Sequence, residues 1–116
     1  MKKVLVVNDS ELIQDMVRMA MGELCAILRA TSLQMGRELY DQNQDVDLVV
    51  MDGCVDSSSL DSIPLVEEIR KTYKGPILAA SSSFLCNEEL VLAGCDCEIK
   101  NTRDLIPKIK LILGIE

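Results

Sequence analysis

The sequence contains no histidine and no tryptophan, and only two tyrosines and one phenylalanine among 116 residues. Without histidine, the chain lacks the usual general base of nucleophilic hydrolases. The closest cysteines, Cys95 and Cys97, have C-x-C spacing and no second pair accompanies them, so zinc binding is disfavoured. The cysteines are instead typical of reduced thiols in a cytoplasmic protein. We expect all five, at positions 25, 54, 86, 95 and 97, to be free thiols. A disulfide between Cys95 and Cys97 is disfavoured, because residues two apart in a strand point the same way but lie about 6.5–7 Å apart.

An excess of positive charge is also missing. The formal net charge is −7 and the pI is about 4.5, which argues against a basic nucleic-acid-binding surface and favours an acidic site that holds a cation. No apolar run is long enough to cross a membrane, and the run over residues 4–7 is too short for a secretory signal. We therefore expect neither a nucleic acid nor a membrane as a direct partner.

Two short apolar runs are present, and both predict buried strands. Residues 4–7 and 48–51 are apolar without alternation, which is typical of strands buried on both faces of a parallel sheet. Asn8 and Asp9 close the first run, and Asp52 closes the second. No glycine-rich loop follows the first run, so nucleotide binding lacks its usual sequence element.

The remaining segments continue this alternation of apolar runs and helical periodicity, with no hairpin signals between them. Such alternation predicts one domain over residues 1–116, with a flavodoxin-like, doubly wound sheet of five parallel strands in the order 2-1-3-4-5 and helices on both faces. The further strands are expected at 26–31, 77–80 and 97–100, and the helices at 12–24, 33–40, 64–73, 87–93 and 105–113. A long loop covers 53–63, and its three serines are either modification sites or ordinary solvated loop.

The strand order predicts where a ligand would bind. In an open sheet of order 2-1-3-4-5, the crevice lies between the carboxyl ends of strands 1 and 3, where the order reverses. Asp9 and Asp52 follow these two strands. The alternative interpretation is that Asp52 merely opens a turn, but the agreement between its position and the predicted crevice favours a site.

The chain resembles a response-regulator receiver domain of two-component signalling. The resemblance rests on residues 4–10, 47–52, 76–82 and 93–96. It implies that Asp52 accepts a phosphoryl group from a histidine kinase or phosphotransfer protein, with Mg²⁺ as cofactor. The implied Mg²⁺ ligands are Asp9, Asp52 and the backbone carbonyl of Cys54, while the Ser81 hydroxyl would contact the phosphoryl group. The only chemistry implied is phosphorylation and dephosphorylation of the domain itself.

The chain departs from the family at three of these positions. Asn8 replaces a carboxylate, which keeps an oxygen but removes a charge, so we expect weaker Mg²⁺ binding. Asn101 stands where the family has a lysine, with Lys100 as a possible substitute after a one-residue shift. We favour the unshifted alignment because it keeps Ile99 facing the core. Glu98 then occupies the position of the family's aromatic switch residue.

Two functions therefore remain open. One is a phosphoacceptor switch, and the other is a pseudo-receiver that binds proteins and takes phosphate weakly or not at all. Either would act on an unknown downstream protein through a surface built from the fourth helix, the fifth strand and the fifth helix. The surface carries charges of both signs, on Glu88, Glu89, Lys100, Arg103, Lys108 and Lys110. The alternative interpretation is an ordinary solvated surface, which would have a similar composition.

Overall fold

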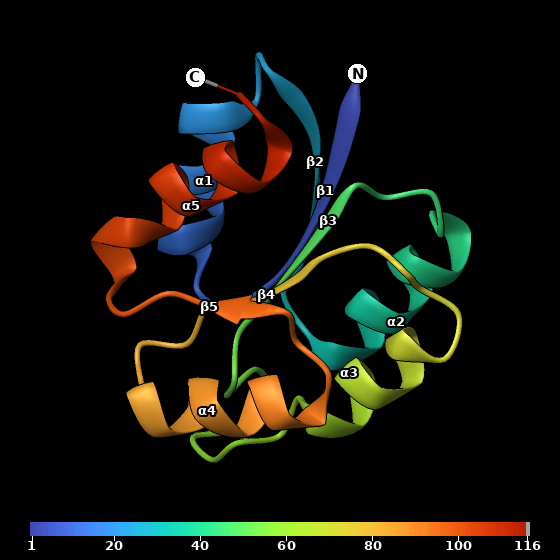
Figure 1. Cartoon of the computed structure of the whole chain (residues 1–116), viewed down its shortest axis with the longest axis vertical. Coiled ribbons are helices and arrows are strands. Elements are labelled where there is room, and N and C mark those ends of the chain that lie inside the picture. The colour runs from blue at the N-terminus through green and yellow to red at the C-terminus, as the bar shows by residue number, and fades with distance from the viewer. Residues whose placement is uncertain (116) are drawn as a thin grey trace.

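The computed structural model describes residues 1–115 and contains one sheet of five parallel strands in the order β2-β1-β3-β4-β5 (Figure 1). This confirms the predicted strand order. Glu116, the last residue of the predicted domain, lies outside the described residues. The strands are β1 (Lys2–Val7), β2 (Cys25–Ala30), β3 (Leu48–Met51), β4 (Ile77–Ala79) and β5 (Cys97–Glu98). The helices are α1 (Glu11–Met21), α2 (Leu33–Gln42), α3 (Ile63–Arg70), α4 (Phe84–Ala93) and α5 (Leu105–Leu113), with a 3₁₀ turn, η1 (Thr102–Asp104), before α5.

The helices cover both faces of the sheet. Helices α1 and α5 lie on one face, and α2, α3 and α4 lie on the other (Figure 1). Side chains of β1 and β3 alternate between two buried clusters, so Val7 and Val49 face α2 and α3 while Val6 and Val50 face α1 and α5. This explains why both runs are apolar throughout. Burying each of these side chains stabilises the fold by roughly 1.5–3 kcal/mol.

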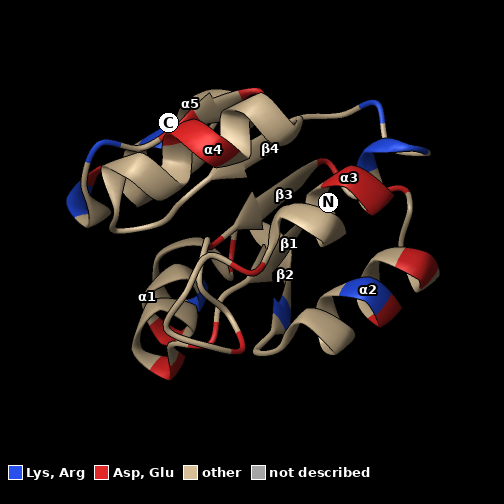
Figure 2. Ribbon diagram, turned by 90° about the horizontal axis from the view of Figure 1, so that it is seen from below, with Lys and Arg blue, Asp and Glu red and all other residues tan. Residues whose placement is uncertain are grey.

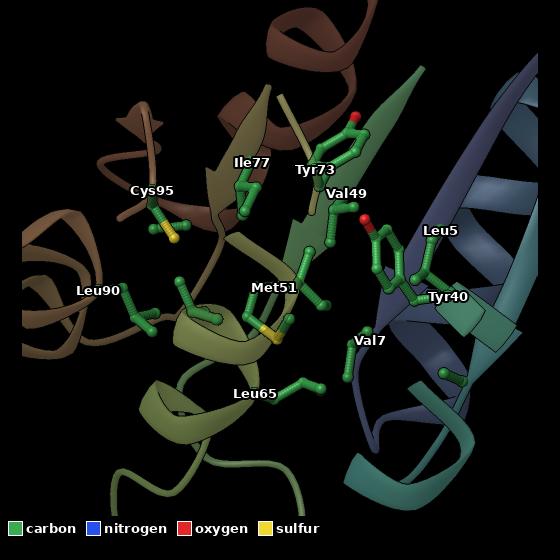
Figure 3. Close-up of a cluster of buried hydrophobic side chains, with 14 of the residues drawn as sticks. Leu5, Val7, Tyr40, Val49, Met51, Leu65, Tyr73, Ile77, Leu90 and Cys95 are labelled. Atoms are coloured by element: carbon green, nitrogen blue, oxygen red, sulfur yellow. The ribbon is translucent and has the colours of Figure 1, made fainter. Parts of the chain in front are cut away.

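The cluster beneath α2, α3 and α4 contains both tyrosines. The rings of Tyr40 and Tyr73 meet edge to face, with centroids 5.8 Å apart and planes at 80° (Figure 3). The Tyr40 hydroxyl shares a 2.8 Å hydrogen bond with the Thr72 hydroxyl. Both tyrosines therefore lie between α2 and the end of α3, and neither lines the cavity at the sheet edge.

Strand register brings the polar strand ends to one edge. Val7 of β1 pairs with Ala30 of β2 and with Met51 of β3, so the three strands end at the same level. The chain continues the pairing for one more residue, because the Asp52 amide donates to the Val7 carbonyl at 3.0 Å. The residues that follow β1 and β3 therefore share one end of the sheet.

Several predicted boundaries are wrong by two or three residues, and α1 ends at Met21 rather than residue 24. Helix α4 begins at Phe84 rather than Asn87, because Ser83 caps it and accepts a hydrogen bond from the Cys86 amide. Helix α3 ends at Arg70 rather than residue 73. The Arg70 guanidinium then holds the following turn through the carbonyls of Tyr73 and Gly75.

Strand β5 is also shorter than predicted. It spans only Cys97–Glu98 instead of 97–100, and Cys95 lies outside it. We expected Cys95 and Cys97 to point the same way with their separation preventing a disulfide. They instead pack on opposite sides of the sheet, Cys95 among the α2–α4 cluster and Cys97 against the α1–α5 cluster. A disulfide between them is excluded more firmly by this geometry than by the spacing of a strand.

All five cysteines are free in the structure. Within residues 1–115, no helix combines the length and the apolar character that a transmembrane span requires.

Candidate functional site

A cavity of about 240 Å³ lies at the carboxyl edge of the sheet. Asp9 and Asp52 both line it, as the strand order predicts. The cavity draws on the ends of β1, β3, β4 and β5, and its lining residues are Asn8, Asp9, Ser10, Ile13, Asp52, Ala80, Ser82, Ile99, Thr102 and Leu105. An open cavity with two carboxylates is a suitable place for a divalent cation and a phosphoryl group.

The turn after β1 holds Asn8 in a defined position. Its amide oxygen accepts a 2.8 Å hydrogen bond from the Ser10 amide, and its own backbone amide donates to the Ala30 carbonyl. Ser10 then caps α1 by accepting from the Ile13 amide. The Asn8 side chain is 7% exposed, whereas Asp9 is exposed. The oxygen that Asn8 would offer to a cation is therefore already engaged in the turn.

The Gln14 side chain stabilises this turn through hydrogen bonds. The role of Gln14 was not predicted from the sequence. Its side chain is fully buried, and its Nε2 donates to the carbonyls of Val6, Asn8 and Ala30 at 2.9, 3.1 and 3.1 Å. These bonds join the ends of β1 and β2. The available signal was a polar residue between the apolar positions Ile13 and Val17 of an amphipathic helix.

Asp52 is half-buried, and its carboxylate accepts a 2.8 Å hydrogen bond from the Gly53 amide. Burial raises the pKa of Asp52 to about 6, although the Gly53 hydrogen bond opposes the change. The negative charges of Asp9 and Asp61 raise this pKa further. A cation bound between Asp9 and Asp52 would offset both the burial and the repulsion, so these carboxylates fit a divalent metal.

The loop after β3 is folded tightly. The Gly53 carbonyl accepts hydrogen bonds from the Asp61 amide, the Ser62 amide and the Ser62 hydroxyl at 3.0, 3.3 and 3.1 Å. The Asp61 carboxylate accepts from the amides of Val55 and Asp56, each at 2.8 Å. The sequence predicts a long loop over 53–63. The structure shows that the Asp61 carboxylate holds this loop in a defined conformation.

Three oxygen donors are predicted to bind Mg²⁺. The predicted donors Asp9 and Asp52 line the cavity, and the third predicted donor is the backbone carbonyl of Cys54, two residues after Asp52. Residues 1–115 contain no cluster of three or more Asp, Glu, Cys or His side chains suited to a metal. A hard cation that keeps several waters, such as Mg²⁺, suits a site with only two carboxylates.

Ser81 lies beside this loop but does not line the cavity. It is 4% exposed, and its hydroxyl accepts a 3.1 Å hydrogen bond from the Ser83 amide. A β-carbon on Gly53 would lie 3.3 Å from the Ser81 Oγ. The neighbouring Ser82 is the exposed hydroxyl that lines the cavity. The Ser81 hydroxyl accepts from Ser83, so its own hydrogen remains free to donate to a phosphoryl oxygen.

Asn101 and Lys100, the two candidates for the position at which the family has a lysine, follow β5. Ile99 is 4% exposed and packs in the core, as the unshifted alignment requires. Asn101 precedes η1, and its Oδ1 is buried without a hydrogen-bond partner among residues 1–115. Lys100 is exposed. Neither Asn101 nor Lys100 lines the cavity, whereas Thr102 does.

The predicted partner surface is assembled from three neighbouring elements. Glu88 and Glu89 are exposed on α4, Lys100 and Arg103 are exposed after β5, and Lys108 is half-buried on α5. Figure 2 shows the acidic segment of α4. Large apolar side chains are exposed on the same helices, namely Phe84, Leu85, Val91 and Leu92 on α4 and Leu111 on α5.

No family model and no curated protein matches the chain. Solved structures do match over almost its whole length. A two-component response regulator from Clostridium difficile has a TM-score of 0.82 at 19% identity, covering 98% of this chain and 97% of that chain. The CheY-like receiver domain protein from Methanospirillum hungatei gives 0.77 at 23% identity, covering 98% and 94%. The BeF3-activated N-terminal receiver domain of RstA from Klebsiella pneumoniae gives 0.78 at 18% identity, covering 97% and 98%.

These likenesses establish the fold. The chain has the five-stranded, CheY-like fold of response-regulator receiver domains. The sequence resemblance to that family and the fold therefore agree.

Proposed function

We propose that the chain is a phosphoacceptor domain with a response-regulator role in two-component signalling, and that Asp52 takes the phosphoryl group. One observation carries the proposal. Asp9 and Asp52 follow the two strands at which the order of the sheet reverses, and both line the same cavity of a receiver fold. The donor would be a histidine kinase or a phosphotransfer protein in the cytoplasm, and the output would pass to another protein.

The chemistry requires an ionised nucleophile. One Asp52 carboxylate oxygen attacks phosphorus, forming a P–O bond as the P–N bond to the donor breaks, and the leaving nitrogen takes up a proton. With a pKa of about 6, Asp52 is mostly ionised at neutral pH. Bound Mg²⁺ would neutralise charge between the carboxylate and the phosphoryl oxygens. Asp9, Asp52 and the Cys54 carbonyl would hold the ion.

A pseudo-receiver is the second candidate, and two observations favour it. The Asn8 amide oxygen is engaged with the Ser10 amide, and Asn101 does not line the cavity. The site therefore lacks a carboxylate and a cation that the family usually has. In this case the α4–β5–α5 surface would bind its partner without phosphorylation.

Phosphorylation by a small-molecule donor separates the two candidates. The protein is incubated with phosphoramidate and excess Mg²⁺, and its intact mass is followed with time. We expect the mass of one phosphoryl group to be added to the wild type and to Asp96→Asn, a carboxylate control outside the cavity, but not to Asp52→Asn. A folded wild type that gains no mass would support the pseudo-receiver, and an unchanged label on Asp52→Asn would refute the proposed acceptor.

A further inference from the structure

Asn8 lines the cavity at the sheet edge together with Asp52, and its side chain is largely enclosed. The residue is 7% exposed, whereas Asp9, which follows it, is exposed. An enclosed amide side chain normally has hydrogen-bond partners, because leaving a buried donor or acceptor unpaired is costly. Each polar atom of Asn8 therefore has to find a partner in the protein, in solvent or in a ligand.

All polar atoms of Asn8 except one are paired within the protein. Its backbone amide donates to the Ala30 carbonyl at 2.9 Å, and its backbone carbonyl accepts from the Gln14 Nε2 at 3.1 Å. Its side-chain oxygen, Oδ1, accepts from the Ser10 amide at 2.8 Å. Because a backbone N–H can only donate, this last bond fixes which branch of the side-chain amide faces Ser10. The other branch is the NH₂ group, Nδ2.

The Asn8 Nδ2 forms no hydrogen bond with any of residues 1–115. It is also not one of the fully enclosed, unpartnered side-chain atoms of that part of the chain, which belong to Gln14, Tyr73, Glu98 and Asn101. The Nδ2 group thus reaches open space, and the open space that Asn8 lines is the cavity. An amide NH₂ group has two donors and no acceptor, so it suits a ligand with oxygen lone pairs and does not bind a metal ion.

We propose that Asn8 is a phosphoryl-binding residue, whose Nδ2 donates a hydrogen bond to an oxygen of the phosphoryl group that Asp52 accepts. This inference rests on the proposed function, since it adds a contact to the same group. The sequence predicts a weakened Mg²⁺ ligand at position 8, but the oxygen that would bind the ion is held by Ser10. An aspartate at position 8 would place a second oxygen where Nδ2 lies, and so exchange a phosphoryl contact for a metal ligand.

The cavity provides no positively charged donor for a phosphoryl group. Asp9 and Asp52 bring two carboxylates to it, and no lysine or arginine of the described chain lines it. The phosphoryl oxygens carry negative charge throughout the transfer, and a positioned N–H in an enclosed site stabilises that charge. Asn8 keeps both amide protons. A P–O bond to Asp52 replaces the P–N bond of the donor, and the leaving nitrogen takes up a proton.

The direct test observes the Asn8 side chain itself. The full chain, isotope-labelled at nitrogen, is phosphorylated with phosphoramidate in saturating Mg²⁺, and its side-chain NH₂ signals are recorded by NMR before and after. Asn8→Asp, which lacks the NH₂ group, assigns the signal. We expect an Asn8 amide proton to move downfield on phosphorylation and to return as the phosphoryl group is lost. The Asn43 amide, which donates to the Leu39 carbonyl outside the cavity, should not move.

Asn8→Ala separates a phosphoryl donor from a metal ligand. Loss of the donor should slow the labelling of Asp52 in saturating Mg²⁺ by at least about tenfold, since one donor aimed at transferred charge typically contributes that much or more. The dissociation constant of Mg²⁺ should stay within about twofold of the wild-type value. Asn43→Ala, which also removes a hydrogen-bonded amide but lies outside the cavity, should change neither quantity.

The inference is overturned if the Asn8 amide signal stays in place while Asp52 is labelled. It is equally overturned if folded Asn8→Ala labels at the wild-type rate, or if its only defect is weaker Mg²⁺ binding that excess Mg²⁺ corrects. Each of these results leaves the phosphoacceptor standing.

A wild type that takes no label would instead refute the phosphoacceptor. Inorganic phosphate is then titrated into the protein with Mg²⁺ present. A saturable downfield shift of the Asn8 amide would support its contact with a phosphate oxygen, and an unmoved signal would overturn it.

Discussion

Ser81 and Asn87 exchange two hydrogen bonds across the junction between β4 and α4. The Ser81 amide donates to the Asn87 side-chain oxygen at 2.8 Å, and the Asn87 Nδ2 donates back to the Ser81 carbonyl at 2.9 Å. Asn87 is 1% exposed, and its Nδ2 also donates to the Ile99 carbonyl beyond β5. One buried amide therefore fixes the ends of β4 and β5, which carry the predicted phosphoryl-contact residues.

Replacing this amide should destabilise the fold. In Asn87→Ala, the Ser81 amide and two carbonyls lose their partners in a buried environment, so we expect the free energy of unfolding to fall by about 2–4 kcal/mol. Urea denaturation measures the change. Glu88→Ala, an exposed neighbour on the same helix, should stay within about 0.5 kcal/mol of the wild type. Equal stabilities for the two variants would show that Asn87 does not hold the strand ends.

Asp52 should make the fold less stable as the pH rises. Its pKa is about 6 in the folded protein against an ordinary value of 3.8, so the native state binds the proton more tightly than the unfolded state. The resulting stabilisation is full below about pH 4 and is lost as the pH passes 6. Because Asp52 is only half-buried, we discount the shift for solvent screening and expect on the order of 1–2 kcal/mol.

Comparison with Asp52→Asn isolates this effect. The variant should gain stability relative to the wild type between pH 4 and pH 7, measured by urea denaturation at each pH. Saturating Mg²⁺ should reduce the difference, since it stabilises the ionised wild-type carboxylate. A difference between the two proteins that does not change with pH would contradict the raised pKa.

Asn8→Asp should strengthen Mg²⁺ binding. The substitution restores a negative charge beside Asp9, and a net gain of even ~1.4 kcal/mol gives about tenfold in affinity. Mg²⁺ titration followed by calorimetry provides the dissociation constants. Asn43→Asp adds the same charge after α2, away from the cavity, and should leave the affinity nearly unchanged. A similar gain in both variants would mean that net charge, rather than a ligand at position 8, controls binding.

Gly53→Ala should be costly despite its small size. The new methyl group would meet the Cys86 β-carbon at 3.0 Å, so the loop or α4 has to shift, which typically costs about 1–3 kcal/mol. Thermal unfolding measures the loss, with Ser58→Ala at the exposed tip of the same loop as control. Wild-type stability in Gly53→Ala would show that the loop and α4 are not held as closely as the structure indicates.

The strand order was predictable because it depends on apolar periodicity and on the rules of parallel sheets. The position of Asp9 and Asp52 at one cavity was predictable because it follows from that order. The roles of the buried side-chain amides of Gln14 and Asn87 were not predictable, because each amide bonds to carbonyls at or just beyond the ends of two different strands. The sequence predicts that the helix begins at Asn87, whereas α4 begins at Phe84. In the sequence Asn87 resembles a helix-starting residue, and only its burial shows that it lies in the second turn.

The close approach of Gly53 to α4 was equally hard to predict. It depends on the conformation of the loop after β3, which has no periodic signal in the sequence. The sequence did contain the relevant glycine, but a glycine after a strand is as typical of a simple turn as of a close approach.

The most direct test compares phosphorylation of the wild type with that of a double variant, Asn8→Asp with Asn101→Lys. With phosphoramidate and Mg²⁺, the account predicts slow labelling of the wild type, labelling of the double variant at least about tenfold faster, and no labelling of either once Asp52 is changed to Asn. Labelling that survives the loss of Asp52, or a wild type and a double variant that are both folded and both unlabelled, would contradict the assignment of Asp52 as the phosphoacceptor.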